Sequence, residues 1–252
     1  MSLKRLLGRI AVVTASTDGI GFAIAQRLAR EGAKVIVSSR KAKNVEAATE
    51  KFSQEGLSVT GLVCHVGKSE DRRKLFDEAK KLGGLDILVS NAAVNPEVGS
   101  VFDCSESSWD KIFEVNVKSS FMLAKEALPL LRESKAGRII FISSIAGFQP
   151  FSLLGAYSVS KTALLGLVKA GAGHLASENI TVNSICPGVI ETRFSSSLTE
   201  GAAGEIALSQ IPIGRFGKPH DVSGAVAFLA SDDGAYVTGE NLVIGGGMAS
   251  RL

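Results

Sequence analysis

Short apolar segments rich in β-branched residues alternate with longer amphipathic segments along the whole chain. The short segments have the length of buried strands, and the longer ones carry apolar residues at helical spacing. We therefore expect strands at residues 10–14, 34–39, 58–63, 85–89, 138–143, 180–185 and 239–247. We expect helices at residues 22–31, 43–54, 70–81, 109–131, 156–170 and 219–230. This alternation predicts an α/β domain, spanning residues 1–252, with a doubly wound parallel sheet of about seven strands and helices on both faces.

One segment departs from the alternation. Residues 193–216 are rich in Ser, Ala and Gly, and we expect a loop with one short helix there. Because loops beside a site often close over it, this segment is a candidate lid.

Composition narrows the classes of function. Of 252 residues 45% are hydrophobic, enough for a large core, and the net charge of +3 is not gathered into a basic block that would indicate nucleic acid. No apolar run reaches the roughly 18 residues that a membrane span needs, and no metal site is expected. Cys64, Cys104 and Cys186 are few and odd in number, which favours a reducing compartment and structural roles.

A glycine-rich turn follows the first strand. The chain reads Thr-Ala-Ser-Thr-Asp-Gly-Ile-Gly over residues 14–21 and then becomes helical. A helix N-terminus attracts phosphate, and glycines let the backbone approach a pyrophosphate closely. The spacing differs from the G-x-G-x-x-G fingerprint, so an ordinary strand-to-helix turn stays open as an alternative.

The end of the second strand indicates which dinucleotide would bind. NAD-binding units of this Rossmann type place an acidic residue about 20 residues beyond the glycines, on the ribose 2′-hydroxyl. Here the chain has Ser38, Ser39 and Arg40 and no acid. A guanidinium suits a 2′-phosphate, so we predict NADP(H); the alternative is that Arg40 and Lys41 face solvent.

The segment from Ser144 to Lys161 carries the candidate chemistry. Tyr157 and Lys161 are four positions apart on an expected helix, which places them on one face. A nearby cation favours phenolate, so we expect Lys161 to lower the pKa of Tyr157 toward the range useful for acid–base chemistry. Ser144 follows a strand, where sites gather in open α/β sheets. The Tyr–Lys pair alone would be uninformative.

Further positions suggest site roles of their own. Asn116 stands inside an apolar helical pattern, where an Asn is disfavoured unless it holds a kink or a water. His65 follows a strand and could flank an adenine, although a lone His is more often structural. An apolar wall for a lipophilic substrate is expected from Phe148, Phe151, Leu154 and Phe194, which are equally compatible with core or oligomer contacts.

Taken together, the motifs resemble those of the short-chain dehydrogenase/reductase family over essentially the full length. They are Thr14-Ala15-x-x-x-Gly19-x-Gly21, Asn91-Ala92-Ala93, Asn116, Ser144, Tyr157-x-x-x-Lys161 and Pro187-Gly188. The resemblance implies NADPH-dependent reduction of carbonyl compounds, including retinal. It also implies a homotetramer assembled through the helices that bear Asn116 and Tyr157.

The resemblance also implies roles for individual residues. Tyr157 would protonate the carbonyl oxygen, Lys161 would lower its pKa and bind the nicotinamide ribose, and Ser144 would hold the substrate oxygen. Asn116 would position a water in a proton relay to Lys161. The cofactor would be bound by Ser16, Gly19, Ile20, Gly21, Ser39, Arg40, Asn91, Ala92, Tyr157, Lys161, Pro187, Gly188, Ile190 and Thr192.

Three positions depart from the family pattern. Ala15 and Ala93 stand where glycines are usual, and His65 replaces the usual Asp near the adenine. An added methyl is tolerated where φ is negative, so we expect intact cofactor binding, although the turn geometry is then in question.

Two other functions remain open on the sequence. One is a 3-oxoacyl thioester reductase with the same chemistry, and the other is a cofactor-binding scaffold without turnover, which the intact Ser144, Tyr157 and Lys161 disfavour. The C-terminal Ser250-Arg251-Leu252 is a conservative variant of the Ser-Lys-Leu address. It predicts import into peroxisomes through their import receptor, with some cytoplasmic protein possible as well.

Overall fold

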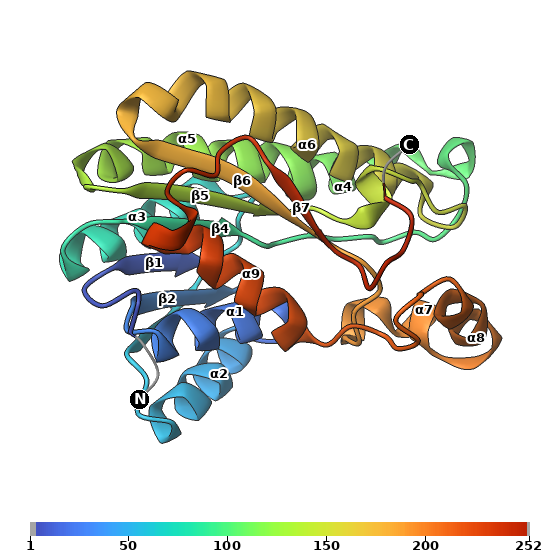
Figure 1. Ribbon diagram of the computed structural model, residues 1–252, viewed down its shortest axis with the longest axis horizontal. Coiled ribbons are helices and arrows are strands. Elements are labelled where there is room, and N and C mark those ends of the chain that lie inside the picture. The colour runs from blue at the N-terminus through green and yellow to red at the C-terminus, as the bar shows by residue number, and fades with distance from the viewer. Residues whose placement is uncertain (1–3, 251–252) are drawn as a thin grey trace.

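The computed structural model describes residues 4–250 and arranges seven strands in one parallel sheet (Figure 1). The strands are β1 (Ile10–Val13), β2 (Lys34–Ser39), β3 (Val59–Val63), β4 (Ile87–Ser90), β5 (Gly137–Ile142), β6 (Ile180–Pro187) and β7 (Asn241–Ile244). Their order across the sheet is β3-β2-β1-β4-β5-β6-β7, and every neighbouring pair is parallel. The predicted doubly wound sheet is confirmed.

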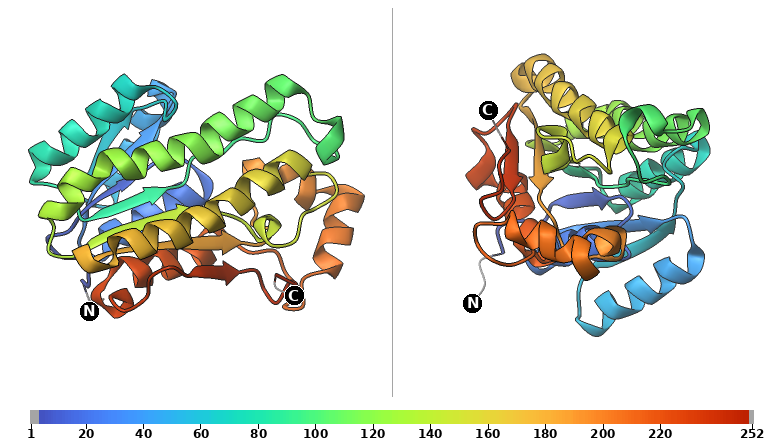
Figure 2. Two further views of the ribbon diagram at one scale, coloured as in Figure 1. Left: turned by 90° about the horizontal axis from the view of Figure 1, so that it is seen from above. Right: turned by 90° about the vertical axis from the view of Figure 1, so that its right-hand side faces the viewer.

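Helices cover both faces of this sheet. They are α1 (Gly19–Arg30), α2 (Ala42–Gln54), α3 (Ser69–Leu82), α4 (Glu106–Ile112), α5 (Ser119–Glu133), α6 (Gly155–Leu175), α7 (Ser196–Thr199), α8 (Gly201–Ser209) and α9 (Pro219–Ala230). Helices α1, α2 and α9 lie on one face, and α3, α5 and α6 lie on the other (Figures 1 and 2). The short helices α7 and α8 project from one end of the sheet (Figure 1).

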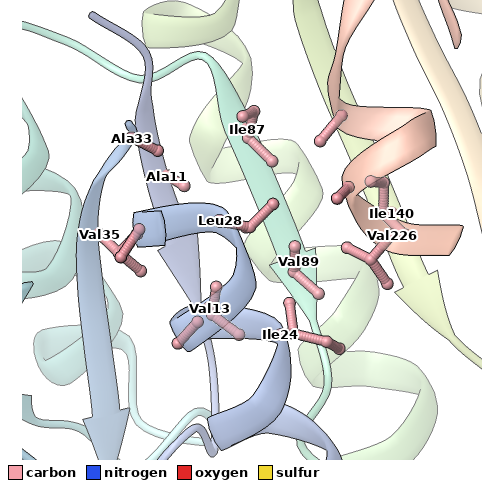
Figure 3. Packing of buried hydrophobic residues seen from close by; sticks show 14 of the residues in the cluster. Ala11, Val13, Ile24, Leu28, Ala33, Val35, Ile87, Val89, Ile140 and Val226 are labelled. Atoms are coloured by element: carbon pink, nitrogen blue, oxygen red, sulfur yellow. The ribbon is translucent and has the colours of Figure 1, made fainter. Parts of the chain in front are cut away.

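Alternation along the strands produces two separate cores. Ala11 and Val13 of β1 point to the α1 face, whereas Val12 points to the α5 face. Figure 3 shows Leu28 of α1 and Val226 of α9 over the first of these surfaces. Because each buried Leu or Val contributes roughly 1.5–3 kcal/mol, these two cores hold the strand ends in fixed positions.

The strand order reverses between β1 and β4. From β1 the chain continues outward through β2 and β3, and it then returns to add β4 through β7 on the other side. The connections leaving β1 and β4 therefore diverge, and a crevice opens beyond their carboxyl ends. The glycine-rich turn and Asn91 lie at this crevice.

Two predicted elements differ from the structure. The single helix expected at 109–131 is divided into α4, a π-helical segment Phe113–Lys118, and α5, and Asn116 lies in the π-helical segment. An Asn in this place marks the irregularity, since its side chain bonds outside the helix. The expected lid holds more structure than predicted, with a 3-10 turn at Arg193–Ser195 before α7 and α8.

Within residues 4–250, no helix combines the length and the apolar character that crossing a membrane requires. In the same described range, no group of three or more His, Cys, Asp and Glu residues is placed to hold a metal ion.

Candidate active site

A cavity of about 480 Å³ lies at the carboxyl ends of the strands. Its walls come from the turn after β1, the ends of β4, β5 and β6, the start of α6, and the segment after Thr192. Of the predicted site residues it brings together Gly19, Ile20, Gly21, Asn91, Ser144, Phe151, Leu154, Tyr157, Lys161, Pro187, Gly188, Ile190, Thr192 and Phe194. Residues from both halves of the sequence thus meet in one cleft.

Tyr157 and Lys161 lie side by side in this cleft, one turn apart on α6. The Lys161 ammonium is 5.4 Å from the centroid of the Tyr157 ring. It donates a hydrogen bond to the Ile142 carbonyl of β5 at 2.8 Å, and the Ser143 hydroxyl bonds the Lys161 carbonyl at 2.9 Å. Both side chains are buried, with exposed fractions of 7% for Tyr157 and 2% for Lys161. The end of β5 therefore fixes the register of α6 at the predicted Tyr157–Lys161 pair.

Burial controls the ionisation of both groups. It raises the pKa of Tyr157 well above the usual phenol value, and a hydrogen bond with Ser144 opposes this shift. Burial lowers the pKa of Lys161 to about 8, and the nearby Cys186 opposes that shift. The expectation that the pKa of Tyr157 is lowered is therefore wrong, because the loss of solvation outweighs the opposing hydrogen bond with Ser144. The phenol remains protonated.

Ser144 stands at the end of β5, as the sequence predicted. It caps a 3-10 turn, Ile145–Gly147, by accepting a hydrogen bond from the Ala146 amide at 3.1 Å. Gly147 packs so closely on α6 that an added methyl would meet the Lys161 backbone at 2.9 Å. The Ser144 hydroxyl is consequently held between the strand end and Tyr157.

The glycine-rich turn is clamped to the end of β4. The Asn91 side chain donates to the carbonyls of Thr14 and Ala15, each at 3.0 Å. A methyl on Gly21 would lie 2.5 Å from both the Ala15 carbonyl oxygen and the Asn91 amide nitrogen, so only glycine fits. Asn91 thus holds the turn as well as lining the cavity.

The backbone conformation of Ala15 differs from our expectation. Its φ is +50°, in the left-handed region, so the negative φ assumed for a tolerated methyl does not hold there. Ala93, in contrast, is not among the described residues with positive φ. Ala15 therefore stores backbone strain at the turn that approaches the proposed pyrophosphate.

Three predicted site residues line neither this cavity nor the smaller cavity beside it. Ser16 is fully buried; its hydroxyl donates to the Val13 carbonyl at 2.6 Å and accepts from the Ser38 amide, which ties β1 to β2. Phe148 is not among the lining residues. The Ser16 side chain thus maintains the turn, contrary to the expectation that it lines the cofactor site, and Phe148 lies outside the cavity lining where the substrate wall was expected.

Asn116 is the third residue away from the cavity surface. Its amide accepts from the Val94 N–H at 2.8 Å and donates to the Val94 carbonyl at 3.1 Å and to the Ser160 hydroxyl at 3.0 Å. Both N–H donors of the side chain are therefore occupied. The side chain fixes the loop after β4 against α6, and the water relay remains a prediction.

A smaller cavity of about 170 Å³ adjoins the main one and shares Ala15 and Ala93 with it. The predicted Ser39, Arg40 and Ala92 line this second cavity together with His65. Among residues 4–250, no hydrogen-bond or ion-pair partner of the Arg40 guanidinium is present. Arg40 therefore lines the smaller of two adjoining cavities and Tyr157 the larger one.

Residues 193–216 contribute the predicted Phe194 to the cavity and also Arg193 and Leu198, which the sequence did not single out. Arg193 forms an ion pair with Asp18 at 3.1 Å, and Asp18 is the N-cap of α1. The Phe194 ring packs on the Tyr157 ring with centroids 5.8 Å apart. Leu198 and Val189 also line the cavity. Only the position of Arg193 directly after Thr192 could have indicated its role.

These features fit a dinucleotide. The α1 N-terminus opens into the cavity beside Gly19, whose φ of +55° lets the backbone turn. The buried Lys161 ammonium uses one of its three donors on Ile142, and its remaining donors have no partner in the described part of the chain. Buried unpaired donors of this kind suit the hydroxyls of a ribose.

Comparisons with known proteins agree with this geometry. A family model described as enoyl-(acyl carrier protein) reductase matches residues 14–249. The chain is 53% identical over 249 residues to the mouse protein named dehydrogenase/reductase SDR family member 4, covering 98% of this chain and 89% of the relative. The chain belongs to the short-chain dehydrogenase/reductase (SDR) family.

Other similarities extend the SDR assignment. The chain is 47% identical to tropinone reductase-like 3 of Erythroxylum coca, over 99% of this chain and 96% of the relative. A crystal structure from Beutenbergia cavernae, of a candidate NAD(P)-dependent gluconate 5-dehydrogenase with NADP bound at low occupancy, has a TM-score of 0.91. It is 31% identical and covers 97% of this chain and 98% of its own. This SDR is therefore an oxidoreductase that uses a nicotinamide cofactor.

Proposed function

We propose that this SDR is an NADPH-dependent reductase that transfers a hydride to the carbonyl of lipophilic aldehydes and ketones, such as retinal, aromatic ketones and dicarbonyls. The reaction would be reversible as alcohol oxidation, and the chain 1–252 would act as one domain. One observation carries the proposal: the Tyr157 phenol, kept protonated by burial, opens into a cavity whose other walls are largely apolar.

Each of the residues around the cavity would have its own role in the reaction. Bound NADPH supplies the hydride that goes to the carbonyl carbon. Tyr157 donates its hydroxyl proton to the carbonyl oxygen, and the Ser144 hydroxyl holds that oxygen by a hydrogen bond. Lys161 binds ribose hydroxyls with its unpaired donors, and its charge stabilises the phenolate left after proton transfer. Asn116 would support reprotonation through a water.

The choice of NADPH rests on Ser39 and Arg40. Both line the smaller cavity, and the Arg40 guanidinium has no counter-ion among the described residues, so it can bind a 2′-phosphate. The NADP in the Beutenbergia cavernae structure is consistent with this choice. The test is to measure the affinities for NADPH and NADH. Arg40→Ala should weaken the affinity for NADPH by about tenfold or more and leave the affinity for NADH unchanged. An unaltered preference would remove the role given to Arg40.

The substrate class rests on the apolar side of the cavity. Phe151, Leu154, Phe194 and Leu198 line it, and they suit a lipophilic body attached to the carbonyl. The test is NADPH oxidation against a panel of aromatic ketones, dicarbonyls, retinal and 3-oxoacyl thioesters. Turnover of 3-oxoacyl thioesters alone would support the 3-oxoacyl thioester reductase that the sequence left open. Binding of NADPH without turnover of any carbonyl would indicate a scaffold.

A homotetramer is proposed on the surface of α5 and α6. Phe121 of α5 and Val159 of α6 are 46% and 39% exposed, and large apolar side chains on an outer helix face are typical of oligomer contacts. Light scattering should give a mass of four chains. Phe121→Lys should reduce the measured mass, whereas Ile206→Lys, in the segment 193–216, should leave it unchanged. A monomeric mass for the unaltered protein would end this proposal.

Import into peroxisomes is proposed from Ser250-Arg251-Leu252, of which Arg251 and Leu252 lie outside the described residues. Deleting the three residues from a tagged protein should move it from peroxisomes to the cytoplasm. An unchanged compartment would contradict the proposal.

A further inference from the structure

Asp18 and Arg193 meet at the N-terminus of α1, on the wall of the main cavity. The Arg193 Nε atom lies 3.1 Å from Oδ2 of Asp18. The other carboxylate oxygen, Oδ1, accepts a hydrogen bond from the Gly19 amide at 2.9 Å. The Asp18 carboxylate is therefore held by a helix amide and a guanidinium, which are the two kinds of donor that bind a phosphate.

The backbone of Arg193 is held in place, whereas its side chain is free to move. Thr192 packs on the glycine-rich turn, since a methyl added to Gly19 would lie 3.2 Å from the Thr192 methyl. The Thr192 amide donates to the hydroxyl of the buried Ser195 at 3.1 Å, which closes the 3-10 turn. The Arg193 side chain is 90% exposed, and the carboxylate of Asp18 is its partner in the described part of the chain. The guanidinium can thus change partner without any refolding of the segment.

The charges on the cavity wall indicate what a new partner would be. Within residues 4–250, the charged side chains that line the main cavity are those of Asp18, Lys161 and Arg193. The next step rests on the proposed function, in which Lys161 binds the ribose and the α1 N-terminus faces the pyrophosphate. In the same described range, the amides of Ile20 and Gly21 have no acceptor, so they are free for that group. Arg193 is then the cation at the pyrophosphate end, and Asp18 is an anion that repels the ligand.

We propose that Arg193 exchanges Asp18 for the cofactor pyrophosphate when a nicotinamide nucleotide binds. In the free protein, Asp18 keeps the guanidinium at the site and competes with the nucleotide for it. The exchange is favourable because an ion pair between exposed side chains contributes little to stability. The guanidinium can instead form two parallel charge-assisted hydrogen bonds with phosphate oxygens, which are stronger. The Gly19 amide remains capped by Asp18 throughout.

The test measures the affinities for NADPH and NADH from the fluorescence change of each nucleotide on binding. Arg193→Gln should weaken both by the same factor, about tenfold, because both contain the pyrophosphate. Asp18→Asn keeps an acceptor for the Gly19 amide and removes the competing charge, so it should strengthen both by about two- to fivefold. Added salt should weaken NADPH binding less steeply in Arg193→Gln than in the unaltered protein.

Arg215→Gln is the matched control. Arg215 lies at the other end of the segment 193–216, pairs with Asp221 at 2.7 Å and does not line the main cavity. This variant should leave both affinities unchanged. Circular dichroism establishes that all the variants are folded.

Three outcomes would overturn the exchange. One is an Arg193→Gln variant with unchanged affinities, and another is a variant that loses affinity for NADPH alone, which would place Arg193 at the 2′-phosphate. The third is an Asp18→Asn variant that binds both nucleotides more weakly, because Asp18 would then support the guanidinium in the complex. Failure of the proposed function looks different, since the unaltered protein would then bind neither nucleotide or would reduce no carbonyl.

Discussion

The Lys161 ammonium lies 5.4 Å from the centroid of the Tyr157 ring, and both side chains are almost completely buried. Among residues 4–250, the cation has the Ile142 carbonyl as its hydrogen-bond partner and no carboxylate paired with its charge. A buried charge of this kind lowers the free energy of unfolding. The protein retains the charge at this site at the expense of stability.

This burial makes stability depend on pH in a defined direction. The pKa of Lys161 is lowered to about 8 in the folded protein from an ordinary value of 10.5. Between these pH values the unfolded chain holds more protons, so the free energy of unfolding rises with pH, by about 3 kcal/mol for this group. Lys161→Met should therefore stabilise the protein by about 1–2 kcal/mol at pH 7, after the lost hydrogen bond is discounted.

Denaturant titrations across pH 7–10.5 test this expectation. The advantage of Lys161→Met should shrink as pH rises through about 8 and reverse before pH 10.5, because the unaltered protein gains about 3 kcal/mol over that range. Lys169→Met is the control, because Lys169 lies on the same helix with a side chain that is 64% exposed. A difference between Lys161→Met and the unaltered protein that does not change with pH would contradict the assignment.

The phenol of Tyr157 should remain protonated in the folded protein at alkaline pH. Burial raises the pKa of this group, and the chain has only two tyrosines, with Tyr236 fully exposed as the reference. The ultraviolet absorbance of phenolate, measured for the unaltered protein minus Tyr157→Phe, should show no step until the protein unfolds. A step near neutral pH would mean that the charge of Lys161 prevails over burial.

Ala15→Gly should stabilise the protein. The left-handed φ costs an alanine about 1–2 kcal/mol, and the greater freedom of glycine in the unfolded chain returns part of this, so a gain of about 0.5–1 kcal/mol is expected. Ala93→Gly, in the same cleft without positive φ, should destabilise instead. Thermal or denaturant unfolding of both variants measures these changes in the free energy of unfolding. Equal changes in the two variants would contradict strain at Ala15.

Phe194 should determine the preference for lipophilic carbonyls. Its ring packs on Tyr157 while remaining 55% exposed, so it can contact a substrate at the proton donor. Phe194→Ala should raise KM for an aromatic ketone about tenfold and change KM for a small dicarbonyl little. Ile206→Ala, on the lid but away from the cavity, is the control. An equal change in KM for both substrates would mean that Phe194 only supports the fold of the segment 193–216.

The sequence sufficed for the architecture because local patterns determine it. Regular alternation of strand and helix patterns predicted all seven strands, and the spacing of Tyr157 and Lys161 predicted their shared face. The grouping of Ser144 with Tyr157 and Lys161 followed because Ser144 comes at the end of a strand whose neighbours end at the same edge.

The features of the site that the sequence did not predict depend on three-dimensional contacts, which the spacing of residues does not encode. The ionisation of Tyr157 depends on how much solvent the folded cleft excludes, and a helix pattern cannot report that. The role of Ser16 changed because Val13 and the Ser38 amide meet its hydroxyl across strands. The φ of Ala15 follows from the clamp by Asn91, 76 positions away.

The central claim is that the Tyr157 hydroxyl gives the proton to the carbonyl oxygen in this cleft. The most direct measurement is NADPH oxidation with a reactive ketone by Tyr157→Phe, alongside the affinity of the same variant for NADPH. We predict a fall in kcat of about 10²–10⁴-fold with the NADPH affinity kept within about threefold. A variant that binds NADPH and reduces the ketone at the unaltered rate would contradict the account.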